Sequence, residues 1–180
     1  WRHGVLTGIV SRLIAERCGV LHKERLFVAG LIHDIGKLIL CYKLPKLERQ
    51  AIQYAVEQEL ALHVAERDVI GYDHAEVGAE LMRSWGFPAT HQATARYHHE
   101  PGMATEHSLD VAIVNLADLI SHLAESGNEN WDALHAVDRD IWQLAQIRIS
   151  DVEALLVDAR DQFIDTLSLF RPRNNADHAA

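Results

Sequence analysis

Apolar residues recur at intervals of three and four along nearly the whole chain, and clear stretches that alternate apolar with polar residues are absent. The first spacing places apolar side chains on one face of an α-helix, whereas alternation would place them on one face of a strand. A chain of 180 residues with 48% hydrophobic content can bury one substantial core. The sequence therefore predicts an all-α protein that folds as a single helical bundle.

Glycines, prolines and polar loops divide this pattern into separate helices. The most apolar segment, 23–42, is expected to be the central buried helix. The full set of expected helices is 1–18, 23–42, 45–66, 73–84, 88–99, 109–125 and 150–170, with shorter helices before the last. Residues 1–170 are predicted to form the domain, and residues 171–180 a flexible C-terminal tail.

Two glycines lie inside the apolar segment 23–42. Gly30 and Gly36 each lower helix stability by about 1 kcal/mol relative to alanine. Glycine at these positions indicates either close packing between helices or room for a ligand beside the backbone.

The chain carries 17 basic and 26 acidic residues, a formal charge of -9. This charge disfavours broad contact with nucleic-acid backbones or anionic lipid, so neither is a predicted partner. No run approaches the roughly 18 apolar residues of a membrane span, and the beginning lacks the pattern of a secretion signal. We therefore expect a soluble, cytoplasmic protein in which Cys18 and Cys41, isolated from each other, remain free thiols.

Several histidines and aspartates occur within the apolar helices, where an uncompensated charge costs roughly several kcal/mol. Imidazole and carboxylate groups suit iron, manganese, zinc or nickel, and a carboxylate can bridge two cations. A single histidine of this kind is usually a hydrogen-bonded core residue, but the whole set indicates a site for two divalent metal ions. The predicted ligands are His3, His33, Asp34, His74, His98, His99 and Asp118. The remaining histidines are assigned to surface or unremarkable roles: His22, His63, His91, His107, His122, His135 and His178.

Motifs around these residues resemble those of the HDOD domain, a branch of the HD superfamily of metal-dependent phosphohydrolases. The matching segments are Phe27 to Lys37 (FVAGLIHDIGK), Gly71 to Gly78 (GYDHAEVG), Trp85 to Pro88 (WGFP), Tyr97 to Pro101 (YHHEP) and Leu116 to Asp118 (LAD). They follow the family's order at similar intervals over roughly residues 1–125. The resemblance implies a helical bundle of the HD-domain type. Because the family commonly has a further helical segment before the equivalent of Trp1, we expect the sequence to be a fragment of a longer protein.

The resemblance also implies roles for individual residues. One metal would be held by His3, His33, Asp34 and Asp118, and Asp34 would bridge to a second metal held by His74, His98 and His99. Asp34 and Lys37 are the expected catalytic residues, with Lys37 facing substrate phosphate. This arrangement is similar to the two-metal centre of HD-GYP cyclic-dinucleotide phosphodiesterases. The Gly-Tyr-Pro motif of that group is absent after Glu100, so cyclic di-GMP is not predicted as the substrate.

Three functions remain open on the sequence. The first is a metal-dependent phosphohydrolase, either phosphodiesterase or phosphatase, that acts on a small phosphorylated or nucleotide-like molecule in bacterial signalling. The second is a non-catalytic signal-transduction module that recruits a signalling protein and keeps a structural or vestigial metal. The third and least favoured is a di-iron oxygenase. The sequence does not identify the substrate, the partner or the oligomeric state.

Overall fold

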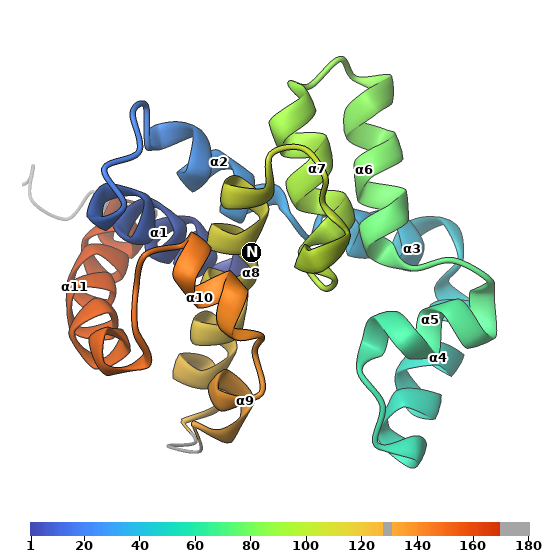
Figure 1. Cartoon of the computed structure of the whole chain (residues 1–180). Coiled ribbons are helices and arrows are strands. Elements are labelled where there is room, and N and C mark those ends of the chain that lie inside the picture. The colour runs from blue at the N-terminus through green and yellow to red at the C-terminus, as the bar shows by residue number, and fades with distance from the viewer. Residues whose placement is uncertain (128–130, 170–180) are drawn as a thin grey trace, which may run out of the picture.

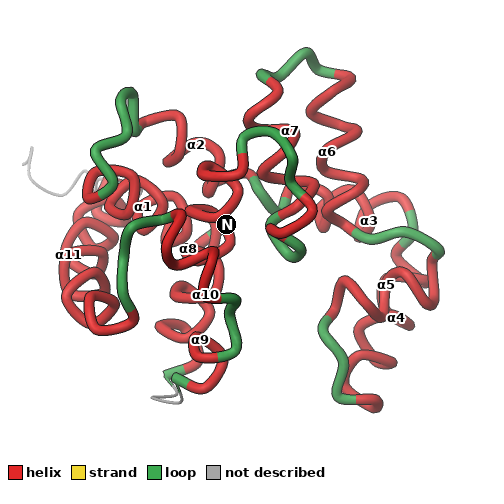
Figure 2. Tube along the Cα trace, in the orientation of Figure 1, coloured by secondary structure: helices red, strands yellow, loops and turns green. Residues whose placement is uncertain are grey.

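The computed structural model of the chain describes residues 1–127 and 131–169, and all regular structure in these ranges is helical (Figures 1 and 2). The elements are α1 (Arg2–Arg17), α2 (Glu24–Ile32), α3 (Ile35–Lys43), α4 (Pro45–Gln58), α5 (Leu62–Ile70), α6 (His74–Ser84), α7 (Ala89–Tyr97), η1 (Pro101–Met103), α8 (Ser108–Ser126), α9 (Asp132–His135), α10 (Arg139–Leu144), η2 (Ile149–Asp151) and α11 (Val152–Leu169). This confirms the all-α class. No described helix is both long and apolar enough to cross a membrane. The predicted tail, 171–180, lies outside the described residues.

The main hydrophobic core forms around α1 and α8, which pack against each other (Figure 1). Ile14 of α1 and Ile113 of α8 are fully buried there. Helices α2, α10 and α11 close the core from other sides. The prediction that the segment 23–42 is the central buried helix is wrong, since Leu38 and Tyr42 are exposed. The longer α8 has that role because other helices contact it on several sides.

The predicted helix 23–42 is also not continuous, because it breaks at His33 and Asp34 between α2 and α3. The Lys37 N–H donates to the Asp34 carbonyl at 3.0 Å, which is the short-range bond of a tight turn. The Asp34 side chain makes no capping bond to α3 and lies among histidines from other helices instead. The periodicity of the sequence continues through this break, so it does not reveal it.

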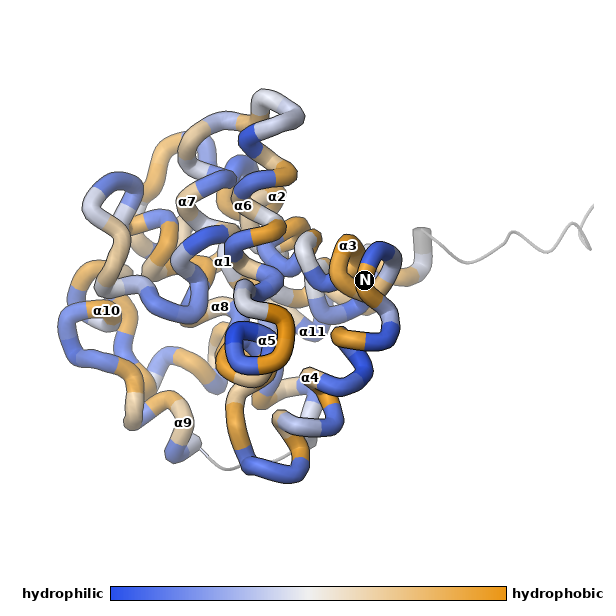
Figure 3. The backbone as a smooth tube through the Cα atoms, turned by 90° about the vertical axis from the view of Figure 1, so that its right-hand side faces the viewer, coloured by the Kyte–Doolittle hydropathy of each residue, from blue (hydrophilic) through white to orange (hydrophobic). Residues whose placement is uncertain are grey.

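A second reversal divides the predicted helix 45–66. Helix α4 ends where Glu59 takes a left-handed conformation with φ 54°, and the Leu60 N–H donates to the Ala55 carbonyl at 2.9 Å. Helix α5 then packs along α4, and Figure 3 shows hydrophilic and hydrophobic residues mixed along both helices. The reversal brings Glu66 of α5 close to Glu48 of α4.

Glycines allow two of the closest helix contacts. A Cβ atom at Gly36 would lie 1.9 Å from the carbonyl oxygen of His74, and one at Gly30 would lie 2.5 Å from Ser11 Oγ. Only glycine fits at such distances, so the expected close packing is confirmed at both positions. At Gly36 the contact presses α3 against the first residue of α6, which is His74.

Candidate metal centre

The structure brings all the predicted ligand residues together, although His3 and Asp118 are 115 positions apart in the chain. They come from the start of α1, the break between α2 and α3, the start of α6, the end of α7 and the middle of α8. Within each of two groups, the ligand atoms all lie within 4.8 Å of one another. The Asp118 group consists of His3, His33 and Asp118, and the Asp34 group consists of Asp34, His74, His98 and His99.

In the Asp118 group, one carboxylate oxygen meets two imidazoles. Asp118 Oδ1 lies 2.9 Å from His3 Nε2 and 3.4 Å from His33 Nε2. His33 is fully buried, and Asp118 is nearly so. The three side chains therefore form a compact, sheltered set of nitrogen and oxygen donors.

In the Asp34 group, the carboxylate again faces imidazoles. Asp34 Oδ1 lies 3.3 Å from His74 Nε2 and 3.6 Å from His98 Nε2, while His74 Nε2 and His99 Nε2 are 2.9 Å apart. The other oxygen, Asp34 Oδ2, lies 3.5 Å from His33 Nε2. One carboxylate thus joins the two groups.

The outer nitrogens of the rings fix which atoms face the centre. His33 Nδ1 donates to the Gly30 carbonyl at 2.7 Å, and His98 Nδ1 donates to the Ala95 carbonyl at 2.8 Å. Because each Nδ1 must carry a proton to donate, Nε2 of the neutral ring has a free lone pair. The buried atoms His33 Nε2, His98 Nε2 and Asp34 Oδ1 have no hydrogen-bond partner. Unpartnered buried acceptors directed at one place fit a divalent cation.

The charges of the cluster also suit a cation. Burial raises the pKa of Asp34, but the adjacent imidazoles of His33, His74 and His98 outweigh burial and hold that pKa well below its usual value. The pKa of Asp118 is also held well below its usual value, because the hydrogen bond with His3 and the adjacent His33 imidazole outweigh burial. Burial, assisted by neighbouring imidazoles, lowers the pKa of His98 and of His99. The carboxylates are therefore ionised and these two imidazoles neutral, which are the forms that bind metal.

His74 differs from the other histidines of its group. Burial alone would lower its pKa, but the adjacent carboxylates of Asp34 and Glu66 outweigh burial and raise the pKa to about 9. In the absence of a cation, His74 is thus protonated at neutral pH, with Nδ1 donating to Glu66 and Nε2 facing His99 and Asp34.

A cavity of about 790 Å³ adjoins the two groups. Lys37, His74, His99, Asn115 and Asp118 contribute to its wall. Lys37 also lines this cavity, and its Nζ lies 2.6 Å from Asp34 Oδ2 and forms an ion pair there. A small anionic molecule in the cavity would therefore lie beside both Lys37 and the ligand groups.

His63 and His122, assigned from the sequence to surface or unremarkable roles, both line this cavity. The His122 ring stacks on His3 with centroids 4.2 Å apart, and its Nε2 lies 3.4 Å from Asp118 Oδ1. The His63 ring stacks on His99 with centroids 4.1 Å apart. The spacing of four between Asp118 and His122 places both on one helix face and could have revealed His122.

Carboxylates behind the ligands were also not predicted. Glu66 Oε2 accepts from His74 Nδ1 at 2.6 Å, and Glu125 Oε2 lies 2.9 Å from His3 Nδ1. Glu125 lies seven positions after Asp118 on α8, on the same helix face, whereas no local pattern marks Glu66.

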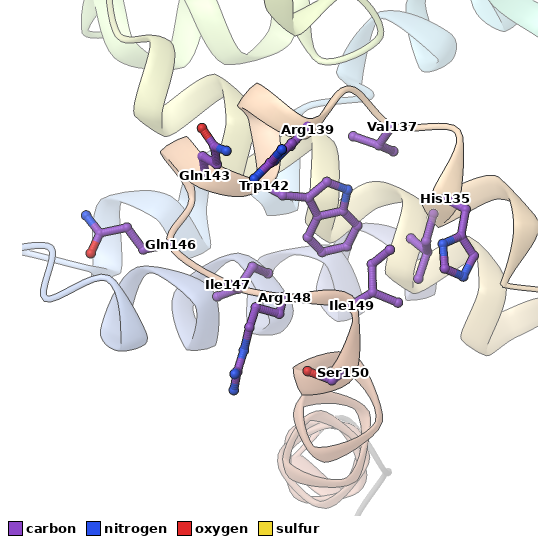
Figure 4. A pocket seen from close by; sticks show the side chains of 11 residues that line it. His135, Val137, Arg139, Trp142, Gln143, Gln146, Ile147, Arg148, Ile149 and Ser150 are labelled. Atoms are coloured by element: carbon purple, nitrogen blue, oxygen red, sulfur yellow. The ribbon is translucent and has the colours of Figure 1, made fainter.

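A second cavity, of about 680 Å³, lies beside Trp142 (Figure 4). Its wall comes mainly from α10 and the segment that leads to α11, and it includes Arg139, Ile147 and Ile149. None of the predicted ligands lines this second cavity, so the candidate chemistry belongs to the first one.

Comparison with known proteins gives one family match and several similar folds. Residues 1–101 match a family model described as the HDOD domain. An HDOD domain protein of unknown function from Geobacter sulfurreducens has a similar crystal structure, with a TM-score of 0.76, 24% identity and coverage of 92% of this chain and 59% of that chain. A protein from Shewanella amazonensis, proposed to be a phosphohydrolase, has a TM-score of 0.71 and 25% identity, with coverage of 89% and 58%. A protein from Marinobacter aquaeolei, proposed to act in signal transduction, has a TM-score of 0.77 and 17% identity, with coverage of 94% and 38%. The chain thus spans less than two thirds of each of these proteins.

Proposed function

We propose that this chain, which belongs to the HDOD domain family, holds two divalent metal ions and hydrolyses a small phosphoester. The observation that carries the proposal is the position of Asp34, whose carboxylate faces imidazoles of both ligand groups while its Oδ1 has no hydrogen-bond partner. The structure of a protein proposed to be a phosphohydrolase, at 25% identity, supports the same direction.

The residues would divide the work as follows. The Asp118 group would hold one cation and the Asp34 group the other, with Asp34 shared between them. Divalent cations in such a centre polarise a phosphoryl group and generate a nucleophile from water near neutral pH. Lys37, on the wall of the cavity, would leave Asp34 to pair with substrate phosphate once cations neutralise that carboxylate. Iron, manganese, zinc and nickel all accept this donor set.

The size of the cavity supports a small substrate. About 790 Å³ accommodates a nucleotide-sized molecule, and apolar side chains such as Leu62, Met103 and Ile141 also line the cavity. A phosphoester with an apolar or aromatic body would place its phosphate at the ligand groups and its body against these side chains.

Metal analysis followed by turnover assays tests the proposal. The purified protein, loaded with manganese or iron, is assayed on nitrophenyl phosphate mono- and diesters and on linear and cyclic nucleotides. We expect turnover that falls at least about 100-fold in Asp34→Asn, because that carboxylate is shared by both ligand groups. Asp161→Asn, which removes an exposed carboxylate of α11, is the matched control and should keep full activity. Turnover that survives Asp34→Asn would refute the proposed role of the centre.

A second function, a non-catalytic signalling module, is favoured by a different observation. Leu38 and Tyr42 of α3 and Ile52 and Val56 of α4 are exposed, and these two helices pack against each other. Exposed apolar side chains on adjoining helices are typical of a protein-binding surface. Bound metal without turnover on any substrate of the panel would favour this module over the hydrolase, and oxygen consumption by the iron form would favour an oxygenase.

A further inference from the structure

Four of the predicted ligand histidines have a hydrogen-bond partner at Nδ1, the ring nitrogen that faces away from the centre. These partners are of two kinds. His33 and His98 donate from Nδ1 to backbone carbonyls of their own helices. His3 and His74 instead have a carboxylate at Nδ1, from Glu125 and Glu66 respectively. Each ligand group therefore contains one histidine backed by a carboxylate.

The two carboxylates differ in their surroundings. Glu66 is fully buried, and its Oε2 accepts both from His74 Nδ1 at 2.6 Å and from the His74 backbone N–H at 2.8 Å. Glu125 makes one contact, at 2.9 Å, and 37% of its side chain is exposed. A buried charge acts through a lower local dielectric, so Glu66 should influence its histidine more than Glu125 does.

Burial of the Glu66 carboxylate costs free energy unless a partner group compensates for the lost contact with water. No lysine or arginine pairs with it among the described residues, and its nearest ionisable neighbours are His74 and Glu48. Glu48 is itself buried, and burial together with the charge of Glu66 raises the pKa of Glu48. Glu48 Oε2 and Glu66 Oε1 both lack a hydrogen-bond partner. The two hydrogen bonds that Glu66 does accept both come from His74, so this carboxylate is oriented toward that residue.

We infer that Glu66 is a positioning residue of the candidate metal centre, which holds the His74 ring through Nδ1 so that Nε2 is directed at Asp34. This inference rests on the proposed function. A carboxylate behind a ligand histidine fixes its tautomer and raises its affinity for metal, and loss of such a partner typically costs 10- to 100-fold in affinity.

The experiment compares Glu66→Gln with Glu125→Gln in the whole chain. Zinc and manganese affinities are measured by equilibrium dialysis, and the melting temperature of each metal-free protein is recorded. We expect Glu66→Gln to weaken the binding of one cation by at least about 10-fold, and Glu125→Gln to weaken binding by less than about fivefold. Cobalt-loaded Glu66→Gln should show a shifted visible absorption spectrum, since the ligand field at His74 changes.

Two further measurements distinguish a positioning role of Glu66 from a general loss of structure in Glu66→Gln. Glu66→Asp keeps the charge but shortens the side chain, so it should fold and still bind the cation less tightly than the wild type. Nitrogen-15 NMR of the zinc-loaded wild type should show His74 with its proton on Nδ1, a readout that depends on no variant.

The outcomes separate the inference from the proposed function. If the wild type binds cations and Glu66→Gln binds them equally well, or if His74 has its proton on Nε2, the inference is overturned and the proposed centre stands. If the wild type binds no cation at dialysis concentrations, the proposed centre fails and the inference fails with it.

Discussion

The two ligand groups lie in different kinds of protein interior. The Asp118 group adjoins the apolar core of α1 and α8, to which α2, α10 and α11 also contribute. The Asp34 group lies among α3 to α7, and the main core has no fully buried member between Ala29 and Ala112. From the start of α3 to the C-cap residue of α7, the buried polar side chains are Glu48, Glu66, Asp73, His74, His91, Thr94 and His98.

This difference indicates how each part is stabilised. Apolar burial stabilises the α1–α8 part without any ligand, at roughly 25 cal/mol per Å². The apolar residues buried among α3 to α7 are mostly alanines, together with Leu40 and Met82. A cation that neutralises the Asp34 group would therefore contribute a larger share of the stability of α3 to α7 than of α1 and α8.

The strongest test of this comparison is removal of the cation. Chelation should lower the stability by about 4 kcal/mol if the free cation is present at 1,000 times its dissociation constant. Hydrogen exchange should then rise in α6 and α7, while α1 and α8 remain protected. Equal loss of protection in both parts would contradict the comparison.

A cavity made in the apolar core should lower the stability to the same extent whether or not the cation is bound. Ile113→Ala removes a fully buried side chain of α8 and should cost about 3 kcal/mol. Chemical unfolding should give the same loss with and without the cation, because Ile113 belongs to the apolar core. A loss of stability that appears only in the metal-loaded protein would show that the apolar core and cation binding are coupled.

Gly36→Ala sharpens the comparison at the contact between α3 and α6. The added Cβ would lie 1.9 Å from the His74 carbonyl oxygen, so the helices must move apart, at a cost of about 2 kcal/mol. Cation binding by the Asp34 group should weaken in parallel, as dialysis would show. Gly102→Ala is the control, since nothing lies within 4 Å of the added atom. Unchanged binding in Gly36→Ala would show that this contact does not position His74.

The pH dependence should give the most gradual effect, because the change in stability is spread over several pH units. In the chelated protein, the raised pKa of His74 provides stability that is complete below pH 6.5 and is lost as the pH rises through about 9. Over this range the stability should fall with a slope of up to about 1.4 kcal/mol per pH unit for one proton. A cation displaces that proton, so the decline should disappear in the metal-loaded protein. Thermal melts from pH 6.5 to 9 with chelator or with zinc would test this, and identical slopes would contradict it.

The sequence predicted the helical class and the residues that meet in the cluster, but not the helix breaks that bring these residues together. Helical periodicity defines the class, and ionisable residues inside apolar segments indicate the cluster. The breaks at Asp34 and Glu59 were missed because periodicity continues through both of them. The contact of His63 with His99 and that of Glu66 with His74 join different elements, so no local pattern reveals them.

The distance in sequence between His3 and Asp118, 115 positions, has a consequence for how the proposed metal centre would form. Closing so long a loop costs conformational entropy that only the surrounding helix packing repays. The complete set of donors therefore exists only once α8 has docked on α1. The folded domain, and not the unfolded chain, would then be the form that binds the proposed cation.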